Sequence, residues 1–238
     1  MIRALLYADA LRMARDRFVL GLTLYMLTLL FSMRFAVPWF VALLDARFDF
    51  DAHPYLPLFM SYLLFSITPV TPALIGGFLL VDGRQSRVVH ALRVTPLSLG
   101  SYLRIVGVTL ALLGIALMLL TAFIVGAALP GAGALVAACL IASSAGAFGA
   151  FFLAARASDS VEALANAKFL SIASLTPLGA YFVPEPWQFL AGVYPGYWAC
   201  KIYWAANAGE GWLLYAAAGI ACAALWVWGL YRALLRAT

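Results

Sequence analysis

The sequence is short of charged residues. Only 11% of its 238 residues are Asp, Glu, Lys or Arg, compared with about 25% in soluble domains. Hydrophobic residues make up 66% of the chain, and the mean hydropathy is +0.99. A soluble fold of this length needs far fewer apolar residues for its core, so the surplus must face lipid. The composition therefore excludes an ordinary soluble domain and predicts an integral membrane protein.

Residues that perform chemistry are also scarce. The chain has two lysines, Lys168 and Lys201, and neither follows a glycine. Because a P-loop needs G-x-x-x-x-G-K-[ST] to bind phosphates, the chain is not expected to hydrolyse ATP. It contains no H-E-x-x-H and no G-x-S-x-G motif. We therefore predict no catalytic residue, no metal and no cofactor bound by this chain.

Cysteine and histidine are too few and too scattered to suggest a metal site. Cys139 and Cys222 fall in apolar segments and are interpreted as small apolar fillers. Cys200 lies outside these segments and is predicted to be a free thiol on the outer side. The topology below places His53 and His90 on opposite sides of the membrane, where they cannot share a metal.

Six apolar segments are long enough to cross a bilayer. Its hydrocarbon core is about 30 Å thick and needs roughly 20 residues of helix, and helices satisfy their own backbone hydrogen bonds in lipid. We predict an all-α, polytopic membrane protein in which residues 1–238 form a single transmembrane domain. The predicted spans are 18–38, 55–81, 105–129, 134–155, 169–184 and 212–231. None of them contains Asp or Glu, which disfavours ion-driven transport.

The distribution of Lys and Arg predicts the orientation. Twelve of the 15 basic residues fall on the side of the two termini, and three, Arg34, Arg47 and Lys201, fall on the other. By the positive-inside rule, both termini are expected in the cytoplasm of a multi-pass protein of the plasma membrane. The net charge of +5 is thus a topology signal, and no nucleic-acid partner is expected.

Several residues inside the spans are candidates for a pathway or a hinge. Arg34 lies about one turn below the outer interface, where it either extends to the headgroups or borders a lateral substrate portal. The second span contains two prolines that bend a helix and free backbone carbonyls, and Pro177 interrupts the fifth span. The bend is either a packed structural kink or a hinge that lines a cavity. The candidates are Arg34, Thr68, Pro69, Thr71, Pro72 and Pro177.

Two further segments carry packing signals. Ala142, Gly146 and Ala150 recur every four residues in the fourth span, a spacing that allows helix backbones to approach closely. Residues 185–211 are rich in Trp and Tyr and are broken by Pro and Gly. Since Trp and Tyr settle at membrane interfaces, we predict an extracellular interfacial segment there, with one or two helices.

Two basic segments are predicted on the cytoplasmic side. Residues 1–17 alternate apolar and basic groups, which is typical either of an amphipathic helix on the leaflet or of a topology anchor. In the loop 82–104, a short helix is predicted to end at Thr95-Pro96. Its apolar face needs either lipid headgroups or a soluble partner to pack against. The residues concerned are Arg84, Arg87, Val88, Val89, Leu92, Arg93, Thr95 and Pro96.

The order of several short motifs resembles a known family. The motifs are HPYLPL at 53–58, GFLL at 77–80, ALRVTPLS at 91–98 followed by YL at 102–103, VEALA at 161–165 with Lys168, AYFV at 180–183, and YPGYW at 194–198 with Lys201 and Trp204. They cover nearly the whole chain, and ALRVTPLS after a double-glycine span is the most specific. The sequence resembles the permease subunits of type-2 ABC exporters, and most closely the fluoroquinolone-export permeases.

This resemblance implies a role for each cytoplasmic segment. Residues 82–104 would hold a coupling helix that docks on a separate cytoplasmic ATPase, and residues 1–17 would be the connecting helix. ATP and Mg would bind to that partner, and a second permease chain, identical or homologous, would complete the transporter. The expected function is ATP-driven export of an amphiphilic small molecule or drug, and membrane lipid is expected to surround the chain. The family's usual acidic run is absent at 83–86, where only the neighbouring Asp82 is acidic.

Two other functions remain open on the sequence alone. An integral-membrane enzyme acting on lipids would need clustered acidic or histidine residues at the cytoplasmic interface, where the chain offers Asp159 and Glu162. A non-catalytic scaffold or immunity protein would tolerate changes at Val88, Val89 and Leu92.

Overall fold

The computed structural model describes residues 17–85, 98–126 and 129–236, and the regular structure in these ranges is entirely helical. The all-α prediction is therefore confirmed. Five helical segments are long and apolar enough to cross a membrane: α2 (Arg17–Phe48), the interrupted segment His53–Arg84, α6 (Leu99–Val125), α7 (Ala132–Arg156) and α11 (Leu213–Arg236).

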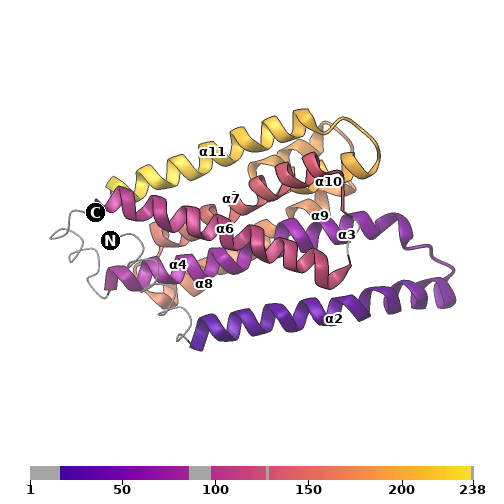
Figure 1. The fold of residues 1–238 in the computed structure, drawn as a ribbon, viewed down its shortest axis with the longest axis horizontal. Helices are drawn as coiled ribbons and strands as arrows, with labels where there is room; N and C mark the ends of the chain where they lie inside the picture. Colours follow the sequence, from indigo (N-terminus) through magenta and orange to yellow (C-terminus); the bar gives the residue numbers. More distant parts are fainter. Residues whose placement is uncertain (1–16, 86–97, 127–128, 237–238) are drawn as a thin grey trace.

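The predicted fifth span, 169–184, has a different form. It is divided between α8 (Ser160–Ser174) and the short helix α9 (Thr176–Tyr181), separated by Leu175. Together the two helices run along the bundle from one end to the other (Figure 1). Neither helix is long enough to cross a bilayer by itself, so the count of six spans stays a prediction.

Several helices extend beyond the ends of the predicted spans. Helix α2 continues through Pro38 to Phe48, and residues 49–52 alone separate it from the next helical residues. Helix α4 (Val70–Gln85) and α6 extend into the predicted loop 82–104, so that Arg84 lies in the last turn of α4. The longer helices take in Asp45 and Asp82 near their ends, and the predicted lack of carboxylates holds only for the middle of the spans.

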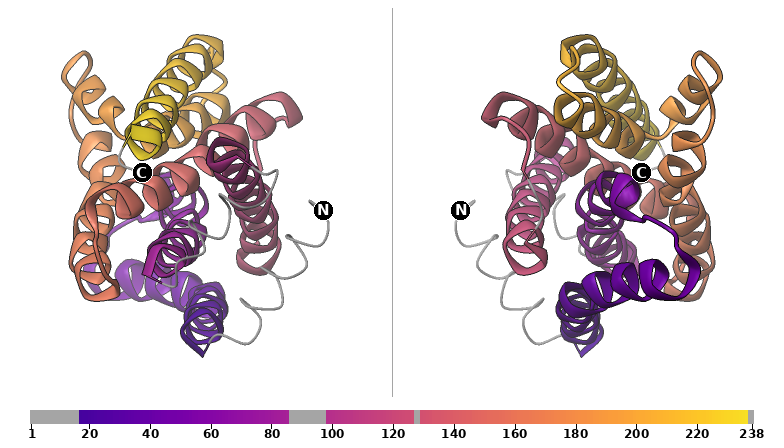
Figure 2. Two further views of the ribbon diagram at one scale, coloured as in Figure 1. Left: turned by 90° about the vertical axis from the view of Figure 1, so that its left-hand side faces the viewer. Right: turned by 90° about the vertical axis from the view of Figure 1, so that its right-hand side faces the viewer.

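Helix α7 lies in the middle of the bundle. It packs against α4, α6, α8, α11 and α10 (Pro195–Asn207), and α2 and α11 lie on opposite sides of it (Figures 1 and 2). The start of α2 and the end of α11 lie at the same end of the bundle. We call this the first end, and the opposite end, which holds residues 49–52 and α10, the second end.

Small residues explain the central place of α7. A methyl group added to Gly149 would come within 2.6 Å of the Ala73 side chain on α4, and one added to Gly146 would come within 3.3 Å of Pro72. Ala142 and Ala150 are fully buried as well. The predicted close approach of helices at this spacing is present, and it joins helices of the same chain.

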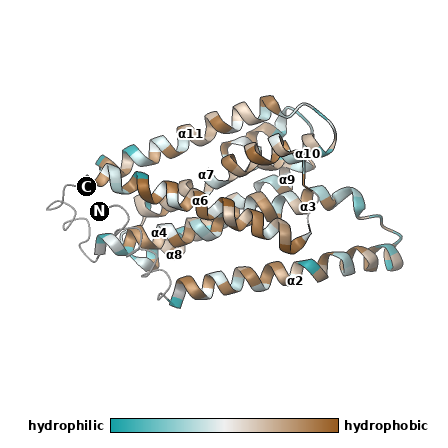
Figure 3. Cartoon of the chain, viewed as in Figure 1, coloured by the Kyte–Doolittle hydropathy of each residue, from teal (hydrophilic) through white to brown (hydrophobic). Residues whose placement is uncertain are grey.

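The long helices are mostly hydrophobic along their length, with hydrophilic residues mainly near their ends (Figure 3). Large apolar side chains are exposed along α2 and α11, among them Phe35, Leu214 and Leu225. Such a surface needs lipid or another apolar partner to cover it. The structure therefore agrees with a membrane protein whose spans lie parallel to the long axis of the bundle.

Residues 185–211 fold back into the second end of the bundle. They form a 3₁₀ helix, η3 (Trp187–Val193), followed by α10. Tyr197, Cys200 and Ile202 on α10 are fully buried, and α10 packs mainly against α7, α11 and α3 (Leu56–Tyr62). The predicted helices are present, and their extracellular, interfacial position stays a prediction.

Candidate functional site

The second span is interrupted at the residues that the sequence singles out. After α3, residues Leu63–Ile67 form a π-helical turn, η2, and α4 begins at Val70. Pro69 has no N–H to donate to the preceding turn. The Thr68 N–H instead bonds to the Leu63 carbonyl five residues earlier, at 3.2 Å. This wider turn accommodates the proline, as π-turns commonly do within helices.

Two threonine hydroxyls lie beside this interruption. Thr68 Oγ1 donates to the Leu63 carbonyl at 2.7 Å, and Thr121 Oγ1 on α6 donates to the Leu117 carbonyl at 2.7 Å. The two oxygens are also 3.2 Å apart. Each hydroxyl has one proton, so two protons serve three contacts. Only two of these three contacts can therefore contain a hydrogen at any one time, and the two hydroxyls place the end of the π-turn against α6.

A second interruption separates α8 from α9. Thr176 donates its hydroxyl proton to the Ala173 carbonyl, and the Ser174 hydroxyl donates to the Ser171 carbonyl at 2.7 Å. Pro177 is the second residue of α9 and is buried. Pro177 has no N–H to donate to the Ala173 carbonyl four residues earlier, and the Thr176 hydroxyl donates to this carbonyl instead, so α8 does not continue smoothly into α9.

The two interruptions touch each other. Ser66 Oγ, in the π-turn, donates to the carbonyl of Ser174 at 2.6 Å, and both residues are buried. Beside this contact is a cavity of about 310 Å³. It is lined by Tyr62, Ile67, Val70, Ser171, Ile172, Ser174 and Leu175. The hydroxyl groups of Tyr62, Ser171 and Ser174 make the lining of this cavity partly polar.

The chemistry available at this site is hydrogen bonding. Its polar groups are hydroxyls and carbonyls, and the described residues leave no buried side-chain nitrogen or oxygen without a partner. No group of three His, Cys, Asp or Glu side chains suited to a metal occurs in the described ranges. The arrangement is suited to binding a neutral polar group and to bending two helices together.

Comparison with known proteins identifies the family. Residues 9–231 match the family described as "Fluoroquinolones export permease protein Rv2686c-like". The chain belongs to this family. It is 28% identical over 198 residues to the fluoroquinolones export permease proteins Rv2686c and MT2760 of two Mycobacterium tuberculosis strains, H37Rv and CDC 1551. The match covers 82% of this chain and 78% of each relative.

The family is one of export permeases, which are transporters rather than enzymes. The resemblance drawn from the short motifs is thereby confirmed. Four of the predicted pathway residues of this permease, Thr68, Pro69, Thr71 and Pro72, lie at one interruption, and Pro177 lies at the other.

Arg34 of the permease lies elsewhere. Its Nη1 donates to the carbonyl of Ile124 at 2.7 Å, close to Gly126, whose left-handed backbone (φ 72°) ends α6. A cation at this position satisfies a free carbonyl and interacts favourably with the helix dipole. Arg34 therefore connects α2 to the end of α6, a role that the sequence did not suggest.

The predicted coupling residues are only partly covered. Arg84 is half-buried in the last turn of α4. Arg87, Val88, Val89, Leu92, Arg93, Thr95 and Pro96 lie outside the described residues, as do residues 1–16 of the predicted N-terminal helix.

The sequence reasoning missed several residues of the permease. Ser66 and Ser174 form the contact between the interruptions, and Trp204 Nε1 donates to Ser61 Oγ at 2.7 Å. The available signal was the presence of hydroxyl residues in the middle of apolar spans. Cys200, predicted to be a free thiol, is fully buried, and burial raises its pKa to about 12. It is therefore not a reactive group.

Proposed function

We propose that the permease is the transmembrane subunit of an ATP-driven exporter of amphiphilic small molecules. The observation that carries this proposal is the contact between Ser66 and Ser174, which joins two interrupted helices inside an otherwise apolar bundle. Transporters commonly place discontinuous helices near the middle of the membrane, where irregular backbone can line a path.

The energy is proposed to come from a separate ATPase. The sequence has no P-loop, so ATP and Mg²⁺ would bind to a cytoplasmic partner. Arg84, Arg87 and Arg93, with the apolar side chains of Val88, Val89 and Leu92 and the stop at Thr95-Pro96, would form the docking helix. A second permease chain would complete the assembly, and both termini would lie in the cytoplasm of a plasma-membrane protein.

The fold suggests how docking would reach the site. Pro69 directly precedes α4 and Arg84 lies in its last turn, and the helix is uninterrupted between Val70 and Gln85. A displacement of the Gln85 end would move α4 as a unit and bend the chain at Thr68 and Pro69. The Ser66 hydroxyl would pass this movement to the carbonyl of Ser174 and so to α8 and α9.

The substrate class is proposed from two sources. The relatives are named for fluoroquinolones, which are aromatic drugs. The spans of the permease supply apolar surface with hydroxyl groups and no carboxylate pair for chemistry. An aromatic amphiphile that partitions into the bilayer fits both facts.

An enzyme that acts on lipids gains no support from the described residues. The two acidic residues that would have served it, Asp159 and Glu162, cap helix α8. Asp159 Oδ1 accepts the Glu162 N–H at 2.8 Å, and Glu162 Oε2 accepts the N–H and hydroxyl of Ser158. This arrangement is similar to a capping box, with the Glu162 bonds going to the residue before the N-cap, and it stabilises a helix start.

The experiment is a pull-down in mild detergent from the native host, with bound proteins identified by mass spectrometry. The wild type is compared with the Arg87→Glu/Leu92→Asp variant. The matched control, Arg232→Glu/Leu235→Asp, makes the same chemical changes near the end of α11. We expect a P-loop ATPase with the wild type and the control but not with the coupling variant. An ATPase recovered equally with all three, or with none, contradicts the proposed coupling.

A further inference from the structure

A second and larger cavity lies near the second end of the bundle. It has a volume of about 610 Å³ and is lined by residues of the second half of α2, of the turn after it, of α3 and of the end of α9. Six aromatic side chains contribute to its walls: Trp39, Phe40, Phe50, Tyr55, Phe59 and Phe182. The rings of Phe50 and Tyr55 are stacked, with centroids 5.8 Å apart. Flat aromatic molecules pack well against such walls.

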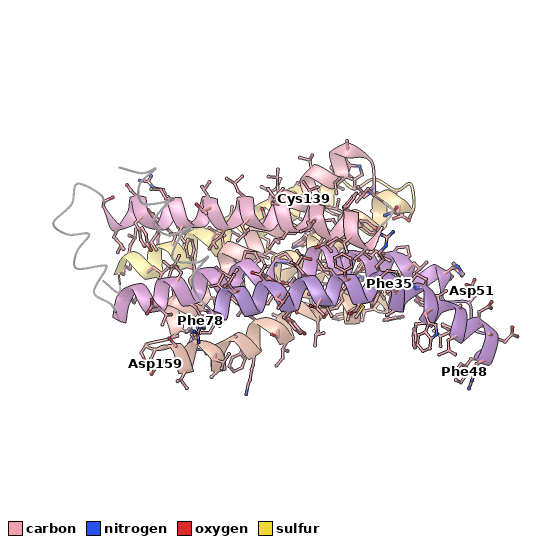
Figure 4. All side chains as sticks on the ribbon, turned by 60° about the horizontal axis from the view of Figure 1, so that its bottom comes forward. Phe35, Phe48, Asp51, Phe78, Cys139 and Asp159 are labelled. Carbon is pink, nitrogen blue, oxygen red and sulfur yellow. The ribbon has the colours of Figure 1, made fainter. Side chains whose placement is uncertain are left out.

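Exposed acidic residues adjoin the lining residues of this cavity in the sequence, and we call them its acidic rim. Asp45, Asp49 and Asp51 flank lining residues on α2 and in the turn after it, whereas Arg47 is the one arginine in that stretch of sequence. Figure 4 shows Asp51 and Phe48 at the second end, far from Asp159. The N–H and ring of His53 bond to Asp51 and lower its pKa, so this carboxylate is charged at neutral pH.

The charge distinguishes between two kinds of apolar occupant. A phospholipid would bring its phosphate toward three carboxylates, which is unfavourable. A protonated amine attached to an aromatic body would be attracted by the carboxylates and by the faces of the aromatic rings. The rim therefore favours a cation over a lipid.

The position on α2 supports an amphiphile. The apolar part of α2, Val19–Phe48, has 30 residues and is therefore about 45 Å long, compared with roughly 30 Å for the hydrocarbon core. Since α2 begins at the first end, its last turns reach the boundary between membrane and water. There the apolar walls face the acyl chains and the carboxylates face water.

We infer that this cavity, which we call the aromatic cavity, binds aromatic amphiphiles that carry a cationic group. The inference rests on the proposed function, because it names the class of molecule that the exporter would take up. Its ligand enters with the aromatic body between α2 and α9 and with the cation among Asp45, Asp49 and Asp51.

The test measures binding to the purified full-length chain in lipid nanodiscs. The probe is rhodamine 6G, a cationic aromatic dye, and the matched probe is the anionic dye fluorescein. Fluorescence polarisation is expected to show saturable binding of rhodamine 6G and no saturable binding of fluorescein.

Three variants test the assignment to this cavity. Asp49→Asn/Asp51→Asn removes two charges, and Asn tolerates the left-handed backbone of residue 49 (φ 50°). We expect a dissociation constant about three- to tenfold higher for it. Ala36→Trp fills the cavity and is expected to abolish binding. The control Leu214→Ala changes an exposed residue of α11 and should leave binding unchanged.

Specific results would overturn the inference. Unchanged affinity in both Ala36→Trp and the double Asn variant would place the dye elsewhere. Equal binding of fluorescein would show that the acidic rim does not favour cationic ligands over anionic ones. Displacement of the dye by phosphatidylglycerol, with no effect of the Asn variant, would make the cavity a lipid site.

The binding assay needs no ATPase, so it separates this inference from the proposed function. Dye binding with the expected variant effects, but without an ATPase in the pull-down, would retain the aromatic cavity and reject the exporter. Recovery of an ATPase without dye binding would retain the exporter and reject the aromatic cavity as a binding site.

Discussion

At the scale of single residues, the polar groups inside the bundle are the most informative. Among the described residues, eight polar side chains are buried, and each lies in a helix or beside an interruption: Ser61, Ser66, Thr68, Thr71, Thr121, Ser143, Ser174 and Gln188. Most of their hydroxyls bond to a carbonyl of their own helix. The bond from Ser66 to Ser174 instead joins residues 108 positions apart, and it therefore couples two helices.

Ser66→Ala tests that bond. Interhelical hydrogen bonds in membranes contribute on average about 0.6 kcal/mol and at most about 1.7, so we expect a loss of stability in this range together with reduced export of rhodamine 6G from cells. The control, Ser143→Ala, removes a buried hydroxyl that bonds within its own helix, to Leu140 at 2.8 Å. Unfolding in detergent and dye accumulation are the measurements. Equal effects on export in the two variants would argue against coupling.

Glu185 gives the permease a dependence on pH. The hydrogen bond from Lys201 Nζ, 2.7 Å long, lowers the pKa of Glu185. A lowered pKa in the folded state means that this contribution to stability is present above the ordinary Glu pKa, near 4.3. It is lost as the pH falls through the lowered value.

We therefore expect Glu185→Gln to reduce thermal stability at pH 7, and we expect this reduction to shrink as the pH falls through the lowered pKa of Glu185. The measurement is the melting temperature of both proteins between pH 3 and 8. Their difference isolates Glu185, because the other carboxylates titrate in both. A difference that grows toward low pH would contradict the assignment of this ion pair.

At the scale of elements, glycine on α7 sets how closely the helices approach. Gly→Ala in an exposed helix stabilises it by up to about 1 kcal/mol. At Gly149 the new methyl would lie 2.6 Å from the Ala73 side chain and 2.7 Å from Leu170. Overpacking of this kind costs about 1–3 kcal/mol.

Gly149→Ala and Gly229→Ala should thus change the free energy of unfolding in opposite directions. Gly229 on α11 has no atom near its added methyl, so Gly229→Ala should be neutral or stabilising, whereas Gly149→Ala should lower the free energy of unfolding. Denaturation of both variants in the same detergent makes the comparison. Stabilisation by Gly149→Ala would mean that α4 and α8 lie farther from α7.

The interruption at Pro69 makes a separate prediction. Pro69→Ala restores a backbone N–H that can bond within the helix, so α3 and α4 should join in one stiffer helix. We expect stability to be kept or raised and export to fall. Pro38→Ala on α2 is the control, since Pro38 lies in a continuous helix. Stability by thermal unfolding and export of rhodamine 6G are measured together, and undiminished export would argue against a hinge.

Much of the element scale could be predicted from the sequence. Runs of apolar residues located five spans, and Thr68 to Pro72 marked the interruption, because proline acts locally. The extension of α2 past Pro38 could not be predicted, since a proline inside a membrane helix is tolerated where its neighbours allow it. The partnership of Ser66 with Ser174, the cap that Arg34 provides and the burial of α10 depend on tertiary contacts that no local pattern carries.

At the scale of the whole molecule, the two ends differ in chemistry. The second end holds α10 and the acidic turn at 49–52, and the first holds the starts of α2, α6 and α8. If the first end is cytoplasmic, a membrane-impermeant maleimide should label Asp51→Cys but not Ser160→Cys in intact cells. Permeabilised cells should show labelling of both. Cys139 and Cys200 are buried and should give little background, and the reverse pattern would invert the orientation.

The unbroken length of α4 has a mechanical consequence. Sixteen residues separate the interruption from the described end of the helix, a distance of about 24 Å. With Pro69 as fulcrum, a rotation of only about 5° would shift the Gln85 end by roughly 2 Å. The helix would act as a lever whose long arm ends near the first end of the bundle. A small force applied at the Gln85 end would therefore produce a smaller displacement but a larger force at Ser66.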